Sequence, residues 1–563
     1  MGRAVGRERQ TVAIVTGGGA GIGAAVAEEL GRTGVFVVTM DPLVSVDGAE
    51  QLARPGQTTA ERIVAAGGAA RSSAVSVTDR AGVNRLFAEI AEEFGGIDAV
   101  VNVAGITRPT SFTRGSEEDW RSVLSVHLDG YRNVLDAALP IMAAAGHGHI
   151  LGVTSGSGWR AADTGAYGCA KRAVASLTWQ LGRHAPPGVV VNAMSPIAMT
   201  RMVTAALGRR STGPSATSSA SKSAVAKSSA TGGLSLGSMP APEQLGPFAA
   251  HLVHADFVAC RGQVLFAAGS ETAVIGEPRL IEAFGIDGAG PLAHALEVLS
   301  PGALVPAEVD QHSRGGSNPR FAALSKNKIG GALPMPAVSS CAVVADASNV
   351  ADAVIVALEA RGVACRRVAS GVGFEGAADA LTSAWSGSQL DAVVLVGSGT
   401  SPVPDGASDW ERVLAEHADI VDQIHGDAAW ARAVADHAAR TERPVRLVTL
   451  TDATSAGGRS RAQASAQLAR AARRATGDRV AAFSVSIETS DPGDAPAVGE
   501  LAAHLLCSPE APPLSGAELV VSPGSIGLRS HPRVDASLTI GTGAVPDWYD
   551  DALSSIVGQD GSR

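Results

Sequence analysis

The stretch TVAIVTGGGAGIGAAVAEEL, residues 11–30, decides the fold of this chain. Residues 12–15 form a short apolar run, which predicts a buried strand. Glycines follow directly, and residues 24–30 continue with the apolar pattern of a helix. A strand, a glycine turn and a helix N-terminus together form an anion site, because glycine lets the backbone approach a pyrophosphate and the helix end offers free N–H groups. The turn therefore predicts nucleotide binding, and a glycine-rich turn without a ligand is the alternative.

A tyrosine and a lysine downstream of this turn are spaced for proton transfer. Tyr167 and Lys171 lie four residues apart in YGCAK, and the whole chain has only 3 tyrosines. Residues i and i+4 share one face of a helix. A free phenol has a pKa of about 10, and a neighbouring ammonium favours the ionised form. We therefore expect Lys171 to lower the pKa of Tyr167, so that the phenol can exchange a proton with a substrate oxygen while a hydride moves at carbon.

Further motifs follow in an order typical of one family. The chain reads NVAG at residues 102–105 and NAMSP at residues 192–196, and Ser155 precedes the Tyr–Lys pair. With the glycine turn, these motifs resemble the short-chain dehydrogenase/reductase family over roughly residues 10–275. Within that family the resemblance is to ketoacyl reductases and to the dehydrogenase part of peroxisomal multifunctional β-oxidation enzymes.

The resemblance implies a doubly wound Rossmann sheet and a role for each motif. Ser155 is similar to the serine that holds the substrate oxygen, with Ser157 as the alternative. Tyr167 matches the family's acid/base, and Lys171 matches the lysine that also binds the nicotinamide ribose. The residues that the resemblance assigns to the cofactor are Thr16, Gly17, Gly19, Gly21, Ile22, Gly23, Asp41, Asn102, Ala104, Gly105, Tyr167, Lys171, Pro196 and Ile197.

Three positions depart from the family pattern. Val103 stands in place of a second asparagine, and Ile197 stands where the family usually has glycine. His127 occupies the helical position where the family often has an asparagine that holds a relay water. The β-oxidation subgroup also has a histidine there. We expect His127 to hold such a water or to exchange protons itself, because a free imidazole has a pKa of about 6.5.

The choice of cofactor depends on Asp41, which follows the apolar run of residues 35–40. An acidic residue about twenty positions after the glycine turn can bind the adenosine ribose hydroxyls. Its charge would repel a 2′-phosphate, so the sequence favours NAD(H) over NADP(H). The alternative is a turn residue before Pro42, because aspartate is common in turns.

Composition excludes several classes of function. The net charge is −10 and no basic run is present, so we expect no nucleic-acid partner. No run of eighteen apolar residues occurs, so no membrane span is expected. The 5 cysteines are scattered without the spacing of metal ligands, which predicts no metal site and fits a cytoplasmic protein.

At 563 residues the chain is long enough for two domains. The sequence DWRSVLSVHLD at residues 119–129 recurs as DWERVLAEHAD at residues 409–419. We therefore predict a tandem duplication, an α/β protein with two Rossmann-like, doubly wound parallel-sheet domains. The predicted division is a catalytic domain over residues 1–285, a linker over 286–335 and a degenerate domain over 336–563. Residues 209–238, rich in Ser, Ala and Gly, are expected to form a flexible lid or an insertion without a role.

The second copy lacks the chemical groups of the first. Residues 341–350 contain no glycine for a phosphate-binding turn. The serine position falls at Leu450 or Thr451, and the tyrosine position falls near Arg461 or Ala462 with no lysine after it. We therefore expect a structural role in which the second copy supplies the surface of a partner subunit. Two chains would then form a homodimer that resembles a tetramer.

The sequence thus predicts an oxidoreductase that interconverts a ketone and a secondary alcohol, with a small ketone or alcohol or an acyl thioester as substrate. Two alternatives stay open. One is an epimerase or dehydratase that uses a bound cofactor without net turnover. The other is a non-catalytic nucleotide-sensing scaffold, against which the retention of Ser155, Tyr167 and Lys171 argues.

Overall fold

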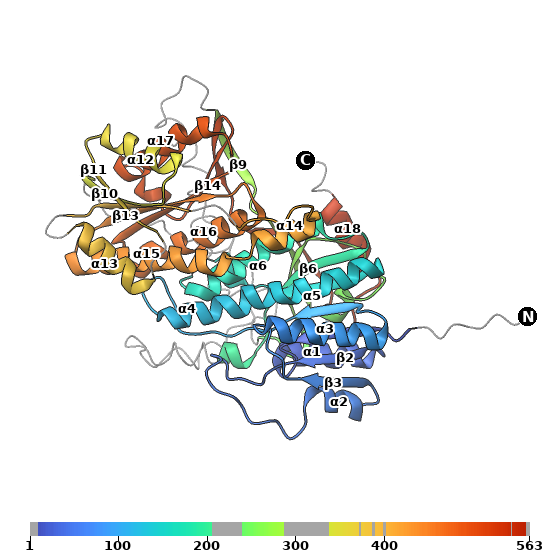
Figure 1. The fold of residues 1–563 in the computed structure, drawn as a ribbon. Helices are drawn as coiled ribbons and strands as arrows, with labels where there is room; N and C mark the ends of the chain where they lie inside the picture. Colours follow the sequence, from blue (N-terminus) through green and yellow to red (C-terminus); the bar gives the residue numbers. More distant parts are fainter. Residues whose placement is uncertain are drawn as a thin grey trace, which may run out of the picture.

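The computed structural model describes residues 9–160, 162–204, 239–285, 337–370, 373–385, 389–397, 401–541 and 543–558. The predicted lid or insertion at residues 209–238 lies outside this set, as does the whole of the predicted linker at residues 286–335. The described residues form two α/β halves that lie against each other, as Figure 1 shows.

A nine-stranded sheet forms the first half. Strands β3, β2, β1, β4, β5, β6 and β7 are neighbours in this order and run parallel, and β8 then pairs antiparallel with β7. This is the strand order of a doubly wound dinucleotide-binding sheet. The strands are β1 (Val12–Thr16), β2 (Phe36–Met40), β3 (Ala69–Ser73), β4 (Ala99–Asn102), β5 (Gly148–Val153), β6 (Val189–Pro196), β7 (Val264–Ala268) and β8 (Glu271–Gly276).

Helices cover both faces of this sheet, which explains why its central strands are apolar along their whole length. Helices α1 and α8 pack on one face, and α3, α5 and α6 pack on the other. The helices are α1 (Gly21–Arg32), α2 (Thr59–Ala65), α3 (Arg80–Phe94), α4 (Glu117–Leu124), α5 (Gly130–Ala145), α6 (Gly165–His184) and α8 (Gly246–Leu252), with short helical turns η1 (Ser125–Asp129), η2 (Gly156–Gly158) and η4 (Pro242–Leu245).

Local residues set the ends of several of these helices. Ser116 and Asp119 form a reciprocal capping box at the start of α4, which satisfies two backbone N–H groups. Gly95 and Gly146 end α3 and α5 in the left-handed conformation that glycine adopts without a steric penalty.

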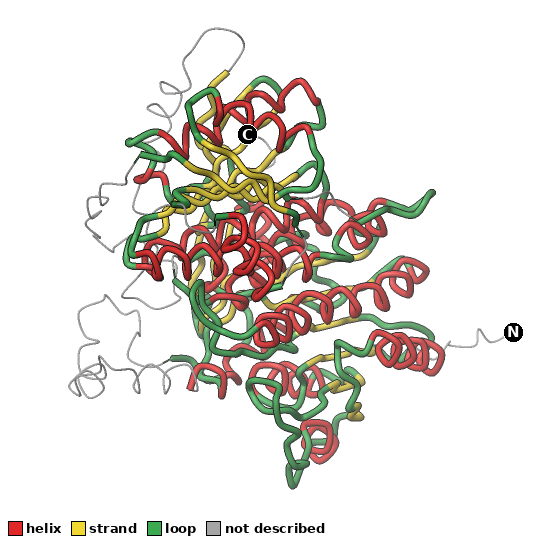
Figure 2. Tube along the Cα trace, turned by 60° about the vertical axis from the view of Figure 1, so that its left-hand side comes forward, coloured by secondary structure: helices red, strands yellow, loops and turns green. Residues whose placement is uncertain are grey.

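An eight-stranded sheet forms the second half, with helices above and below it in Figure 2. Its strand order repeats that of the first sheet, except that the described residues include no counterpart of β3. The strands are β10 (Ser340–Val344), β11 (Ala364–Val368), β12 (Ala392–Val396), β13 (Val445–Asp452), β14 (Val480–Ile487), β15 (Glu518–Ser522) and β16 (Ser525–Arg529). The helices are α12 (Asn349–Glu359), α13 (Phe374–Ala384), α14 (Asp409–Glu416), α15 (Ile420–Thr441), α16 (Ala456–Thr476) and α17 (Ala495–Cys507), with turns η5 (Pro492–Asp494) and η6 (Pro512–Leu514).

The two halves exchange their last strands. Strand β9 (Leu280–Gly285) pairs antiparallel with β16 of the second sheet, and β17 (Arg533–Thr539) pairs antiparallel with β8 of the first. Helix α18 (Tyr549–Gly558) follows β17 and packs on the first half, where Tyr549 meets Phe248 edge-to-face at 5.6 Å between ring centres. The predicted boundary at residue 285 groups β9 with the first domain and β17 with the second, whereas each of these strands pairs with the sheet of the other half.

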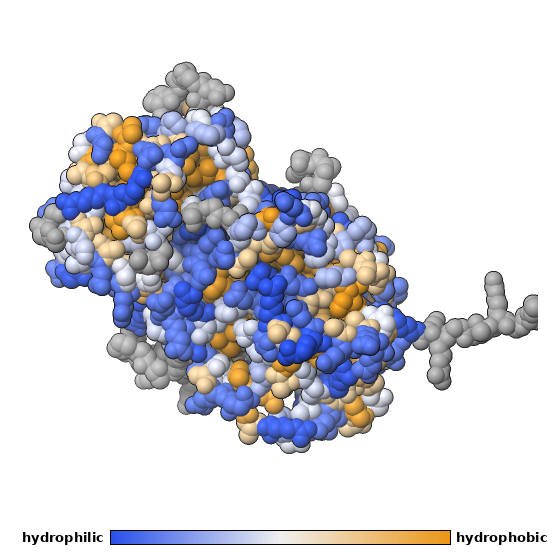
Figure 3. Space-filling model, in the orientation of Figure 1, coloured by the Kyte–Doolittle hydropathy of each residue, from blue (hydrophilic) through white to orange (hydrophobic). Residues whose placement is uncertain are grey.

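Helix α6 of the first half packs along α16 of the second, so that one apolar core spans the interface. Inside it Arg172 pairs with Glu518 at 2.9 Å, and neither side chain is exposed. No helix among the described residues is long and apolar enough to cross a membrane. On the face drawn in Figure 3, hydrophobic patches are interrupted by hydrophilic residues.

Candidate active site

The turn between β1 and α1 has a shape that requires glycine. Gly17 and Gly21 have φ angles of +63° and +56°, in the left-handed region. A Cβ atom on Gly17 would lie 2.9 Å from the Ala104 nitrogen, and one on Gly23 would lie 2.2 Å from the Gly17 oxygen. Among the described residues, the one atom within 4 Å of a Cβ on Gly21 would be a Thr200 methyl carbon, 3.7 Å away. The turn thus fits a ligand whose phosphates approach the backbone.

The segment after β4 is tied to this turn. The Thr16 hydroxyl donates to the Asn102 side-chain oxygen at 2.8 Å and accepts from the Ala104 backbone N–H at 3.1 Å. A Cβ atom on Gly105 would lie 2.4 Å from the His127 ring. The NVAG segment therefore lies between the glycine turn and His127.

Asp41 directly follows β2 and lies beside the turn. One carboxylate oxygen accepts from the Gly19 N–H at 2.9 Å, and the other accepts from the Leu43 N–H at 2.7 Å. Asp41 therefore supports the turn, and its role in binding the adenosine ribose stays a prediction. Of the remaining predicted cofactor residues, Ile22 packs against the apolar core, Pro196 ends β6, and Ile197 donates its N–H to the Ala267 oxygen at 2.8 Å.

The predicted catalytic groups meet at the end of β5 and the start of α6. The Ser155 hydroxyl accepts from the Ser157 N–H at 3.3 Å and shares a hydrogen bond with the Tyr167 phenol. The Lys171 ammonium lies 5.7 Å from the centre of the Tyr167 ring and donates to the Val153 oxygen at 2.6 Å. The site therefore brings together Ser155, Tyr167 and Lys171. Ser157 contributes its backbone N–H, which donates a hydrogen bond to Ser155.

The pKa of Tyr167 differs in direction from the expectation drawn from its lysine neighbour. Burial raises the pKa of the phenol, and only the hydrogen bond with Ser155 opposes this rise. Burial also lowers the pKa of Lys171 to about 7. The pKa of the phenol is therefore shifted in the opposite direction to that expected from Lys171, because burial disfavours the charged form of each group.

His127 lies within the π-helical turn η1, a local widening of the helix that often marks functional sites. Its ring meets Tyr167 edge-to-face, with ring centres 5.3 Å apart and an interplanar angle of 81°. Its Nε2 donates to the Ile106 oxygen at 2.9 Å. Burial, followed by the charge of Lys171, holds the pKa of His127 well below its usual value. This direction opposes the expected exchange of protons by His127 near neutral pH. The expectation that His127 holds a water stays a prediction.

Side chains of the second half hold the segment between Ser155 and Tyr167. Gln467 of α16 donates to the backbone oxygens of Ser157 at 3.1 Å and Arg160 at 2.8 Å. Arg470, also on α16, donates to the Trp159 oxygen. No local sequence signal could have revealed these contacts, because each joins residues that are distant along the chain.

A second set of contacts from the second half holds the loop between β4 and α4. Arg432 of α15 donates to three backbone oxygens in this loop, those of Ser111 at 3.4 Å, Phe112 at 3.2 Å and Gly115 at 3.3 Å. The neighbouring Thr110 hydroxyl accepts from the Ala166 N–H at 3.1 Å, next to Tyr167. The second half therefore contacts backbone on two sides of the candidate site.

In the second half, the corresponding positions serve packing. Leu450 and Thr451 are buried within β13. Arg461 is buried on α16 and pairs with Asp427 at 2.7 Å. His417, the counterpart of His127, lies buried between the Val413 oxygen and the Ser460 hydroxyl, at 2.6 and 2.8 Å. The described residues also contain no cluster of side chains that could hold a metal ion.

Comparison with known proteins identifies the family. A family model described as short chain dehydrogenase matches residues 11–211. The short-chain reductase protein NovJ of Streptomyces niveus is 38% identical over 189 residues, which are 33% of this chain and 69% of that protein. The chain belongs to the short-chain dehydrogenase/reductase family. It is therefore an oxidoreductase of a family that uses NAD(P)(H).

Other relatives agree with this assignment. A 3-oxoacyl-[acyl-carrier-protein] reductase of Synechocystis is 35% identical over 33% of this chain and 72% of its own length. Peroxisomal multifunctional enzyme A of Dictyostelium discoideum is 32% identical over 34% of this chain and 44% of its own length. A solved structure, the N-domain of bacterial malonyl-CoA reductase with NADP, covers 91% of this chain and 97% of its own with a TM-score of 0.63 and 16% identity. That likeness shows the fold, and it extends over both halves.

Proposed function

We propose that the chain is an NAD(H)-dependent oxidoreductase that interconverts a ketone and a secondary alcohol, with Tyr167 as the proton carrier. The observation that carries this proposal is the cluster of Ser155, Tyr167 and Lys171 beside a glycine turn that fits a dinucleotide. The reductases among the relatives support the same reaction class. The substrate class is a small ketone or an acyl thioester, and the relationship to a 3-oxoacyl carrier-protein reductase favours the thioester.

The bound nicotinamide supplies the hydride in the reducing direction. The remaining steps belong to the chain. The raised pKa keeps Tyr167 protonated at neutral pH, so the phenol can donate a proton to the substrate oxygen as that oxygen becomes basic. The Ser155 hydroxyl can donate a hydrogen bond to the same oxygen, as a donor in an oxyanion hole does. The Lys171 ammonium then stabilises the phenolate that is left.

The preference for NAD(H) rests on Asp41. A 2′-phosphate on the ribose would approach a carboxylate that already holds the turn, and like charges at close range repel. Initial rates with NADH and NADPH as the varied substrate would measure the preference. A kcat/KM for NADPH equal to or greater than that for NADH would contradict it.

Replacement of the phenol tests the proposed reaction. Tyr167→Phe should lower kcat for reduction by about 10²- to 10⁴-fold, the usual contribution of a general acid, and should leave the Kd for NADH within about twofold. NADH absorbance with a panel of ketones and acyl thioesters measures turnover, and protein fluorescence measures NADH binding. Tyr549→Phe, which removes a phenol on α18, is the matched control. Near-normal turnover in Tyr167→Phe would remove the phenol as the acid.

A further inference from the structure

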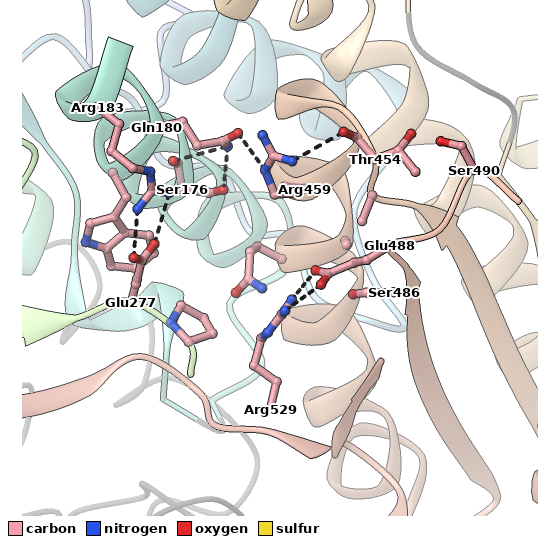
Figure 4. Close-up of a pocket in the computed structure, with 15 residues that line it drawn as sticks. Ser176, Gln180, Arg183, Glu277, Thr454, Arg459, Ser486, Glu488, Ser490 and Arg529 are labelled. Carbon is pink, nitrogen blue, oxygen red and sulfur yellow. Dashed lines mark hydrogen bonds and ion pairs between the residues drawn. The ribbon is translucent and has the colours of Figure 1, made fainter. Parts of the chain in front are cut away.

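A cleft of about 570 Å³ opens between the two halves, and none of the residues that line it belongs to the candidate active site (Figure 4). One wall is the C-terminal part of α6. The other wall comes from the carboxyl ends of β13 and β14 and the start of α16. Ligands of open α/β sheets bind outside the carboxyl ends of the strands. The cleft thus occupies the ligand-binding edge of the second sheet, although that sheet lacks the glycine turn.

Two of the three arginines in the cleft are neutralised by carboxylates. Arg183 donates to both oxygens of Glu277, at 2.7 and 3.2 Å, and Arg529 donates to both oxygens of Glu488. These two pairs leave little net charge for a ligand.

Arg459 is the third arginine, and it has no carboxylate within 4 Å among the described residues. Its guanidinium donates to the Gln180 side-chain oxygen at 3.0 Å and to the Thr454 backbone oxygen at 3.3 Å. Both acceptors are neutral. Three arginines and two glutamates line the cleft, so the lining side chains carry one net positive charge. Glu416, which does not line the cleft, also acts on Arg459 through its charge.

Ser486 adds a second, independent sign of a missing partner. Its side chain is 1% exposed, and its hydroxyl has no hydrogen-bond partner among the described atoms. Figure 4 shows this hydroxyl directed toward the same space as Glu488 and Arg529. A buried hydroxyl without a partner is unfavourable, because folding removes its hydrogen bonds with water.

We propose that this cleft binds a small polar monocarboxylic acid, whose carboxylate pairs with Arg459 and whose hydroxyl or carbonyl oxygen bonds Ser486. Guanidinium binds carboxylate through paired hydrogen bonds. A single negative charge matches the one net positive charge of the lining side chains, whereas a doubly charged phosphate would also meet Glu277 and Glu488. The volume lies within the roughly 300–1,000 Å³ of small-molecule sites. This site does not depend on the reaction proposed for Tyr167.

Isothermal titration calorimetry on the full chain tests the proposal, with gluconate as the probe and sorbitol as its uncharged counterpart. Gluconate should bind at one site, and sorbitol should give no saturable heat. Arg459→Gln should weaken gluconate binding by at least about tenfold, because a charge-assisted hydrogen bond is lost. Arg412→Gln, which removes an exposed arginine of α14, should bind gluconate as the wild type does.

Ser486→Ala provides a second variant that keeps the charge of the cleft. It should weaken gluconate binding by about three- to tenfold, since one neutral hydrogen bond is lost. Circular dichroism confirms that each variant is folded. The proposal is overturned if gluconate fails to bind the wild type, if both cleft variants bind it as tightly as the wild type, or if inorganic phosphate binds more tightly than gluconate.

Discussion

At the scale of single residues, Lys171 is the group through which pH should act on the proposed reaction. Burial lowers its pKa to about 7, and only its ammonium form stabilises a phenolate. Reduction also needs Tyr167 with its proton. Both required forms are the protonated ones, and they are lost as the pH rises. We therefore expect kcat for reduction to be highest below about pH 7 and to fall above it, as measured with saturating cofactor between about pH 5.5 and 9.

The Lys171→Arg variant tests whether the titration of Lys171 causes the expected fall in kcat. A guanidinium keeps its charge because its pKa is above about 12. In the activity that the variant retains, the fall near neutral pH should therefore move to higher pH. The same fall in both proteins would show that another group titrates there, and a flat profile in the wild type would show that Lys171 does not control the rate.

At the scale of helices and strands, the sequence predicts what local patterns encode. The apolar runs at residues 99–101 and 150–153 predict β4 and β5, and i, i+4 spacing predicts that Tyr167 and Lys171 share a face of α6. The exchange of β9 and β17 could not be predicted, because their partner strands are distant in the sequence. For the same reason the direction of the Tyr167 pKa shift was missed: it depends on burial by segments that spacing does not identify.

The exchanged C-terminal segment should stabilise the first half. Leu553 of α18 is 1% exposed and lies in the apolar core formed with α1 and α8. Leu553→Ala should lower the free energy of unfolding by about 2–5 kcal/mol, through lost apolar contact and a residual cavity. Urea denaturation measures this change. Val356→Ala, at an α12 position that is 67% exposed, should cost less than about 0.5 kcal/mol. Equal losses in the two variants would mean that α18 is not part of this core.

At the scale of the whole molecule, we infer that the second half supports the first. The positions that correspond to the catalytic serine and tyrosine hold packing residues in the second half. Side chains of α15 and α16 nevertheless donate hydrogen bonds to backbone segments on both sides of Tyr167. The buried Arg172–Glu518 pair fixes α6 to the second sheet, since a charge buried at an interface is strongly unfavourable without its partner. We infer that the fused copy replaces the neighbouring subunit on which such a site would otherwise depend. Assembly of two chains into a homodimer stays a prediction.

The contacts made by Arg432 give this inference a direct test. Arg432→Ala frees three backbone oxygens of the loop that contacts the start of α6. A small displacement of a reacting group can cost up to about 100-fold in rate, so we expect kcat for reduction to fall by about tenfold while the Kd for NADH stays within about twofold. Steady-state kinetics and NADH fluorescence, at a temperature where circular dichroism shows a folded chain, measure the two quantities. Arg440→Ala removes an exposed arginine from the same helix and should change neither. If Arg432→Ala matched Arg440→Ala in kcat, or if kcat and NADH affinity fell together, the second half would contribute general stability and not the placement of Tyr167.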